Sequence, residues 1–376
     1  MLIHKVEKGE SLYSISEKYG LSPRQISEIN NLTYTDRLSV GRELLILIPT
    51  RTHTSRRGEK IEDICRRFCV SRREILKNNP ALATMANPHP EQTLSLRYPE
   101  RSHGLIFTTG YLYGGFDKDR LSAIERYLSE VILCSAVYDG ERVKKAFNDK
   151  ELSDSILKSK KGLALRIYPK GPYREGYFKD GTVKEFIDAA RRVGAGGIVL
   201  PIPATASEKV WLPFIKALTE AGEKEGLYLT LEVGSDTPLS VIGSSERKIF
   251  SFDPVQKRLQ GAKEYEFKFY NEIYPKIKPE RAMLDLSPFA YRNGEPITVE
   301  KALSVCDKGE REIIYSDDGM SAYFYDRSDR YDLPTLEYIK AKLDLIGELG
   351  FMGVCIDICR CPISHIMLIS SLFHIC

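Results

Sequence analysis

The larger, C-terminal part of this sequence contains eight short apolar runs that alternate with helical segments. Each run has the length of a buried strand and is bounded by turn-forming or polar residues. A repeated strand-helix order predicts a parallel sheet, and eight repeats suit the ~250 residues of a closed (β/α)8 (TIM) barrel. The sequence therefore predicts an α/β fold. The expected strands are 104–113, 131–139, 162–169, 197–204, 227–234, 248–254, 282–291 and 351–358, with helices at 183–193, 208–225 and 335–349.

The N-terminal part is an internal repeat with a period of 49 residues. Each copy opens with a short alternating strand and a glycine turn, continues with two amphipathic segments and closes with a second strand, which predicts a βααβ module. Ser22 and Ser71 are expected to cap the second helices in a capping box. The chain therefore divides into modules at 1–49 and 50–99 and a barrel at 100–376. The repeated positions are Gly9, Leu12, Ile15, Tyr19, Ser22, Ile26 and Asn30, matched by Gly58, Ile61, Ile64, Phe68, Ser71, Ile75 and Asn79.

The two copies, with YSISEKYGLS and an asparagine pair after the second helix, resemble LysM modules. The resemblance implies binding of N-acetylglucosamine chains, in peptidoglycan or chitin, between the first strand-helix loop and the loop after the second helix. Two tandem copies indicate avidity for a polymer, although a βααβ module without a sugar-binding role is the alternative. The second copy departs from the family through Cys69, in place of a glycine, and an insertion near 85–91. Carried over by position, the groove residues are Gly9, Glu10, Ser11, Leu12, Asn30, Asn31 and Leu32, and Gly58, Glu59, Lys60, Ile61, Asn79, Pro80 and Ala81.

Several segments of the barrel resemble glycoside hydrolase family 18, in particular spore cortex-lytic N-acetylglucosaminidases that carry two LysM modules. The matching segments follow in order: TTGYLYGGF, FIDAARRVGAGGIVL, SPFAY, IIYSDDGMSAYFYD and LEYIKAKLDLIGELGFMGVCID. The resemblance implies hydrolysis assisted by the acetamido group of the substrate, with the acid motif DxxDxDxE at the end of the fourth strand. Its final glutamate would protonate the glycosidic oxygen.

The acid motif is missing from this sequence. Its four acidic positions fall on Gly196, Val199, Pro201 and Pro203, and none of these side chains can donate a proton. The family's supporting tyrosine on the sixth strand corresponds to Phe252, beside Phe250. Its tryptophan on the last strand falls at or near Asp357. The sole tryptophan, Trp211, is expected on the helix after strand four, with a packing role in the core or at the surface. The barrel is therefore predicted to be a pseudo-glycosidase.

The alternative to a pseudo-glycosidase is an active site formed by carboxylates at other positions of the barrel. The C-terminal ends of barrel strands line the active face, and Glu232, Asp253, Asp285 and Asp357 are expected there. Two of them at a suitable separation would form a new acid/base pair. An active glycosidase of the N-acetylglucosaminidase type, acting on peptidoglycan or chitin, therefore stays open.

Composition excludes other classes of protein. Lys plus Arg is 55 against 52 for Asp plus Glu, which argues against a protein built to bind nucleic acid. No stretch reaches the ~20 apolar residues of a membrane span, and the charged N-terminus predicts no signal peptide. Eight scattered cysteines suit free thiols in a reducing cytosol, so neither a metal nor a cofactor is expected. The family resemblance implies synthesis in the cytoplasm and deposition on the spore coat, cortex or cell wall, with a spore-coat protein as a further partner.

Overall fold

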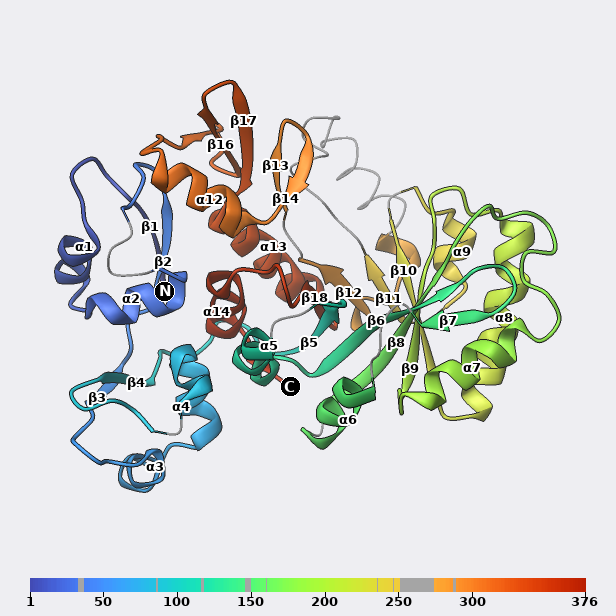
Figure 1. Cartoon of the computed structure of the whole chain (residues 1–376), viewed down its shortest axis with the longest axis horizontal. Helices are drawn as coiled ribbons and strands as arrows, with labels where there is room; N and C mark the ends of the chain where they lie inside the picture. Colours follow the sequence, from blue (N-terminus) through green and yellow to red (C-terminus); the bar gives the residue numbers. More distant parts are fainter. Residues whose placement is uncertain are drawn as a thin grey trace.

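The computed structural model describes residues 1–376 except 33–36, 86, 116–117, 146–149, 160, 235, 246, 251–273 and 287–288. The chain forms two small N-terminal modules, an eight-stranded barrel and an antiparallel sheet inserted late in the barrel (Figure 1). None of the described helices combines the length and the apolar character needed to cross a membrane.

The first module has the predicted βααβ order. It consists of β1 (Leu2–Lys5), α1 (Leu12–Tyr19), α2 (Pro23–Asn30) and β2 (Glu43–Ile46), with β1 and β2 antiparallel. The side chain of Ser22 accepts from the N–H of Gln25, whose own side chain accepts from the N–H of Ser22, so the predicted capping box is present. Gly20 ends α1 in the left-handed conformation that glycine adopts readily.

The second module repeats this order with one addition. It contains β3 (Arg51–Thr54), α3 (Ile61–Phe68), α4 (Arg72–Asn78), a 3-10 turn η1 (Pro80–Thr84) and β4 (Thr93–Arg97). Ser71 caps α4 as expected. Cys69 ends α3 with a φ of 52°, so it takes the left-handed conformation of its glycine counterpart despite its side chain.

The barrel closes through eight parallel strands, as predicted. The last strand pairs with the first, which removes both edges of the sheet. Its strands are β5 (Leu105–Leu112), β6 (Glu130–Tyr138), β8 (Gly162–Pro169), β9 (Gly197–Pro201), β10 (Tyr228–Val233), β11 (Arg247–Phe250), β12 (Ala282–Asp285) and β18 (Gly353–Asp357).

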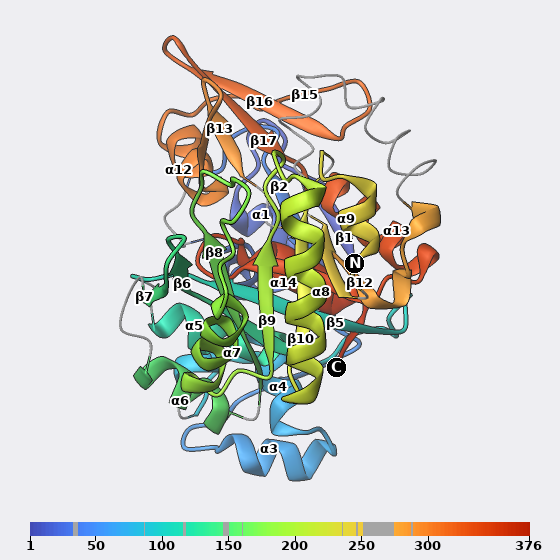
Figure 2. The same ribbon diagram turned by 90° about the vertical axis from the view of Figure 1, so that its right-hand side faces the viewer.

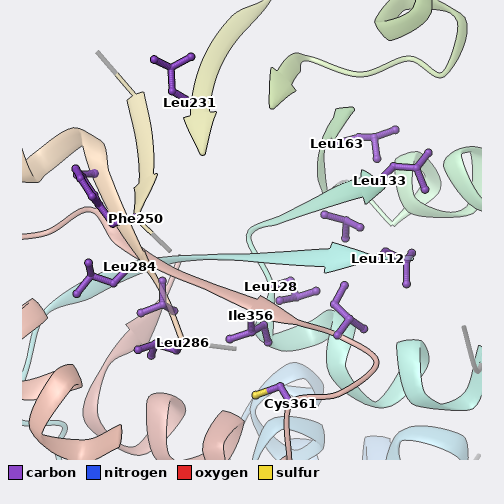
Figure 3. Close-up of a cluster of buried hydrophobic side chains, with 14 of the residues drawn as sticks. Leu112, Leu128, Leu133, Leu163, Leu231, Phe250, Leu284, Leu286, Ile356 and Cys361 are labelled. Atoms are coloured by element: carbon purple, nitrogen blue, oxygen red, sulfur yellow. The ribbon is translucent and has the colours of Figure 1, made fainter. Parts of the chain in front are cut away.

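The outer face of these strands packs against a ring of helices. Alternate residues such as Leu112, Leu231 and Leu284 point outward into one buried cluster (Figure 3). Figure 2 shows α8 lying along the outside of β9. The surrounding helices are α5 (Lys118–Ile124), α6 (Lys150–Lys158), α7 (Thr182–Arg192), α8 (Glu208–Lys224), α9 (Leu239–Gly243), α13 (Leu336–Leu349) and α14 (Ile363–Leu372).

The inserted sheet was not predicted as a separate unit. The run expected as one strand at 282–291 is two strands, because β12 ends at Asp285 and the chain then enters the insertion. The insertion forms a five-stranded sheet with its own buried cluster around Phe324 and Ala302. Its elements are β13 (Ala290–Arg292), β14 (Glu295–Ile297), α12 (Val299–Lys308), β15 (Ile314–Tyr315), β16 (Ser321–Asp326) and β17 (Asp329–Pro334). Two short strands extend the barrel sheet, β7 (Val143–Lys145) and β19 (His374–Ile375).

The first module is docked firmly onto the barrel. Ile29, Leu45 and Leu47 belong to the same buried cluster as the helices of the barrel. Polar contacts surround this apolar centre: the N–H of Ser39 donates to Asp307 at 3.1 Å, and the N–H of Leu336 donates to Glu43. The module and the barrel therefore share one core.

Glu43 makes this docking dependent on pH. Its side chain is 7% exposed, and burial raises its pKa from 4.5 to about 7 despite the Leu336 N–H and Lys5. The folded state therefore holds this proton more tightly than the unfolded state, and stability is lost as the pH rises from about 4.5 to above 7, by an amount on the order of 3 kcal/mol. We expect Glu43→Gln to remove this loss in thermal unfolding between pH 5 and 8. Glu223→Gln, at an exposed position of α8, should show the same decrease of melting temperature with pH as the wild type. An equal decrease in all three proteins would contradict this prediction.

Candidate functional site

The predicted groove of the first module contains both exposed and buried residues. Gly9, Ser11 and Asn31 are exposed, whereas the side chains of Leu12 and Leu32 are buried in the module core. Asn30 is 8% exposed, and its amide donates to the carbonyls of Ile26 and Leu45 and accepts from the N–H of Leu45. Asn30 thus ties β2 to α2, and the exposed side-chain and backbone groups around it are the ones available to a ligand.

The second module repeats this arrangement. Asn79 is buried, and its amide bonds the carbonyls of Ile75 and Ser95 and the N–H of Ser95. Gly58 and Lys60 are exposed, Glu59 is half-buried and Ile61 is fully buried. The inserted segment contacts this groove, because the side chain of Asn87 accepts from the N–H of Ile61 at 3.3 Å. On the other side, Pro80 and Ala81 begin the 3-10 turn η1, which packs against α5.

A histidine–glutamate pair in each module was missed from the sequence. His4 lies 2.8 Å from Glu10, and His53 lies 2.8 Å from Glu59. Glu10 also accepts from the N–H of Glu7, just as Glu59 accepts from the N–H of Arg56. The predicted groove residues Glu10 and Glu59 therefore close the turn before the first helix. The signal was present, since both histidines and both glutamates obey the 49-residue offset.

An ion pair occupies the mouth of the barrel. Arg166 in β8 donates from Nε and from an Nη atom to both carboxylate oxygens of Glu232 in β10, at 2.7 and 3.1 Å. The two side chains are 15% and 19% exposed. Both carboxylate oxygens of Glu232 are therefore engaged by one guanidinium group. The arginine was not recognised from the sequence, because the two residues are 66 positions apart.

The end of β9 carries the positions at which the sequence resemblance predicts the family's acids. Val199 packs in the barrel interior with Tyr111, Ile132 and Cys355. Pro201 is the last residue of β9 and lies beside Glu232, whereas Pro203 follows the strand and is half-buried. The N–H of Ile202 donates to the carbonyl of Glu232 in β10. Because the backbone groups of successive residues point to opposite sides of a strand, the backbone at Pro201 and Pro203 faces the other neighbour, β8. The pairing of β9 with β8 ends at Val199. Gly196 immediately precedes the strand.

The other acids at the mouth differ in environment. Asp357 ends β18, is 3% exposed and accepts from the N–H groups of Cys359 and Arg360. Burial raises the pKa of Asp357, although Arg360 and these two N–H groups oppose the shift. Asp285 ends β12 and is partly exposed. Asp253 and the neighbouring Phe252 lie outside the described residues, and Phe250 is buried on the outer face of the sheet (Figure 3).

The cysteines and the tryptophan sit in apolar surroundings. Burial raises the pKa of Cys355 and Cys361, which disfavours the thiolate form that a metal needs. Within the described part of the chain, no three His, Cys, Asp or Glu side chains are grouped as metal ligands. Trp211 is fully buried and packs on Phe178 and Tyr173, as expected for a core residue.

These features define a LysM domain followed by a barrel with the fold of glycoside hydrolase family 18. Residues 4–47 match the LysM domain family model. The second module lies outside that match, although it has the same βααβ order.

Crystal structures of spore cortex-lytic enzymes share the fold of the whole chain. SleL from Bacillus cereus and SleL from Bacillus megaterium QM B1551 are each 16% identical, with a TM-score of 0.71, over 100% of this chain and 98% of theirs. A mutant family 18 chitinase from Cycas revoluta in complex with (GlcNAc)4 is 14% identical, with a TM-score of 0.58, over 70% of this chain and 98% of its own. Among curated proteins, none matches this sequence at a significant level.

Proposed function

We propose that this protein binds N-acetylglucosamine polymers of the peptidoglycan or chitin type through its N-terminal modules, and that its barrel does not hydrolyse them. The proposal that the barrel does not hydrolyse glycans rests on the end of β9. There, Val199, Pro201 and Pro203 occupy the positions that correspond to the family's acids. No group at these positions can protonate a leaving oxygen. The acid beside them, Glu232, is engaged by Arg166.

The first half of the proposal is supported by the LysM match and by the arrangement of the two modules. Both carry an exposed glycine turn before the first helix, and in both a buried asparagine holds the second loop in place. Rigid loops lose little entropy when a ligand binds. The proposed groove residues are those predicted by position, and the proposed domains are 1–49, 50–99 and 100–376.

One observation favours a second function, an active glycosidase with relocated carboxylates. Asp357 lies at the carboxyl end of a barrel strand, and burial raises its pKa, which is what a general acid requires. Its Oδ1, however, already accepts two N–H groups of the following turn. Release of reducing ends from peptidoglycan or chitooligosaccharides by the purified full chain would establish this alternative and refute the first proposal.

A sedimentation assay tests glycan binding. We expect the full chain to pellet with insoluble peptidoglycan or chitin, and we expect Tyr13→Ala to reduce the bound fraction several-fold, because Tyr13 is 64% exposed and directly follows the groove residue Leu12. Aromatic rings supply contact area at low entropic cost. The matched control is Tyr325→Ala, which removes another exposed tyrosine, on the inserted sheet. A wild-type chain that stays in the supernatant would refute the proposal.

The proposed location follows from the same likeness. Two of the similar structures are spore cortex-lytic enzymes, and we propose that this chain is also associated with the spore cortex, the spore coat or the cell wall. A spore-coat protein that contacts the barrel is part of this proposal. A fluorescent fusion that is absent from spores would argue against this location.

A further inference from the structure

A cavity of about 550 Å³ lies where the first module meets the barrel. We name it the module–barrel cavity. Figure 1 shows α12 and α14 on the side of the barrel that faces this module. The volume of the module–barrel cavity falls within the ~300–1,000 Å³ that is usual for small-molecule sites. The cavity is lined by residues of the first module and of the barrel domain, among them Asn31, Glu43, Glu300, Ser304, Asp307 and His365.

The cavity is continuous with the proposed groove of the first module. Asn31 belongs to both: it is exposed, directly follows α2 and donates its amide to Glu300 of α12 at 3.4 Å. Glu300 in turn accepts from Arg120 of α5 at 3.3 Å. A saccharide lying along the second loop of this groove would therefore meet side chains of the barrel.

Two buried polar atoms on the cavity wall are without hydrogen bonds in the described part of the chain. His365 is 4% exposed, and its Nδ1 has no hydrogen-bond partner among the described residues; Oε1 of Glu43 also lacks a hydrogen bond there, although it lies 3.9 Å from Nζ of Lys5. Burial lowers the pKa of His365 to about 3, so the ring is neutral at physiological pH. A buried polar atom without a hydrogen bond destabilises the protein, and a ligand that bonds it recovers this loss.

The charges around the cavity favour a neutral ligand. Arg42 is paired with Asp307, and Arg37 with Glu310, so these cations are already neutralised. The groups that a ligand would meet are an imidazole nitrogen, carboxylate oxygens, the hydroxyl of Ser304 and the ammonium group of Lys308, so both signs of charge are present. Such groups suit the hydroxyl and amide groups of an uncharged sugar better than a phosphate or a carboxylate.

We propose that the module–barrel cavity extends the glycan site of the first module, and that α12 and α14 of the barrel bind sugar hydroxyl groups there. This inference rests on the proposed function. It assigns to the barrel a binding role that is separate from the mouth of the barrel, where hydrolysis would take place.

Hydrogen exchange of the full chain, with and without saturating (GlcNAc)4, tests this inference. We expect slower exchange at residues 299–308 and 363–366 as well as at 9–12 and 30–32. Protection of the module segments alone would overturn the inference while supporting the proposed function. The absence of any saccharide binding would overturn both.

Blocking the cavity provides a second test. Ser304 is an exposed residue of α12 on the cavity wall, and we expect Ser304→Trp to raise the Kd of the first-module site for (GlcNAc)4 about tenfold. The slowing of hydrogen exchange at residues 363–366 by (GlcNAc)4 should be lost in the same variant. Ser155→Trp places the same side chain at an exposed position of α6 and should leave both readouts unchanged. Wild-type affinity and wild-type protection in Ser304→Trp would overturn the inference.

Discussion

Replacing Arg166 with methionine should lower the free energy of unfolding by about 3 kcal/mol at pH 7. The substitution keeps most of the side-chain volume but leaves Glu232, which is 19% exposed, without the partner that bonds both its oxygens. Removing one member of a largely buried ion pair costs ~3–5 kcal/mol because the remaining charge is uncompensated. Because both side chains stay partly exposed, we expect a loss at the lower end of this range. Chemical denaturation monitored by circular dichroism measures the effect.

The double variant Arg166→Met/Glu232→Leu is the control for this prediction. Two apolar side chains of similar volume leave no charge behind, so we expect most of the lost stability to return. A double variant that is less stable than Arg166→Met would show that the pair is not the source of the effect.

Gly353→Ala should destabilise the barrel by about 3 kcal/mol or more. Gly353 begins β18 and pairs with Phe107 at the point where the barrel closes. A methyl group built on Gly353 would overlap the carbonyl oxygen of Phe107, which is backbone and cannot rotate away. Relief requires β5 and β18 to separate, and that breaks the ladder that closes the sheet.

The matched control is Gly243→Ala at the end of α9. A methyl group there would meet no atom within 4 Å, and alanine is a better helix former than glycine by ~1 kcal/mol. We therefore expect a change of at most about 1 kcal/mol, in either direction, for Gly243→Ala in the same denaturation experiment. Equal effects of the two substitutions would contradict the steric explanation.

The positions of the barrel strands could be predicted because buried strands leave a local signal. Apolar runs bounded by turn residues appear in the sequence wherever a strand is covered on both faces, and all eight expected runs overlap a strand of the closed barrel. The repeat and its helix caps at Ser22 and Ser71 are equally local, since a cap involves residues three apart.

The inserted sheet could not be predicted in the same way. Its strands are short, and β16 alternates buried with partly exposed residues. The apolar run at 282–291 looked continuous across the point where the chain leaves the barrel. One face is buried against α12, which lies within the insertion itself, between β14 and β15. A pattern with a period of two cannot say which other element covers it.

The sequence by itself determined the class of each part, a βααβ repeat followed by an eight-stranded barrel, and it predicted that the family's acid positions carry glycine, valine and proline. Local periodicity and the identity of side chains are sufficient for those conclusions. Only the tertiary structure decided that Asn30 and Asn79 hold the modules together, that Arg166 engages Glu232, and that the first module and the barrel enclose a cavity. These features join residues distant in the chain, and such contacts depend on how the finished elements pack, which no local pattern records.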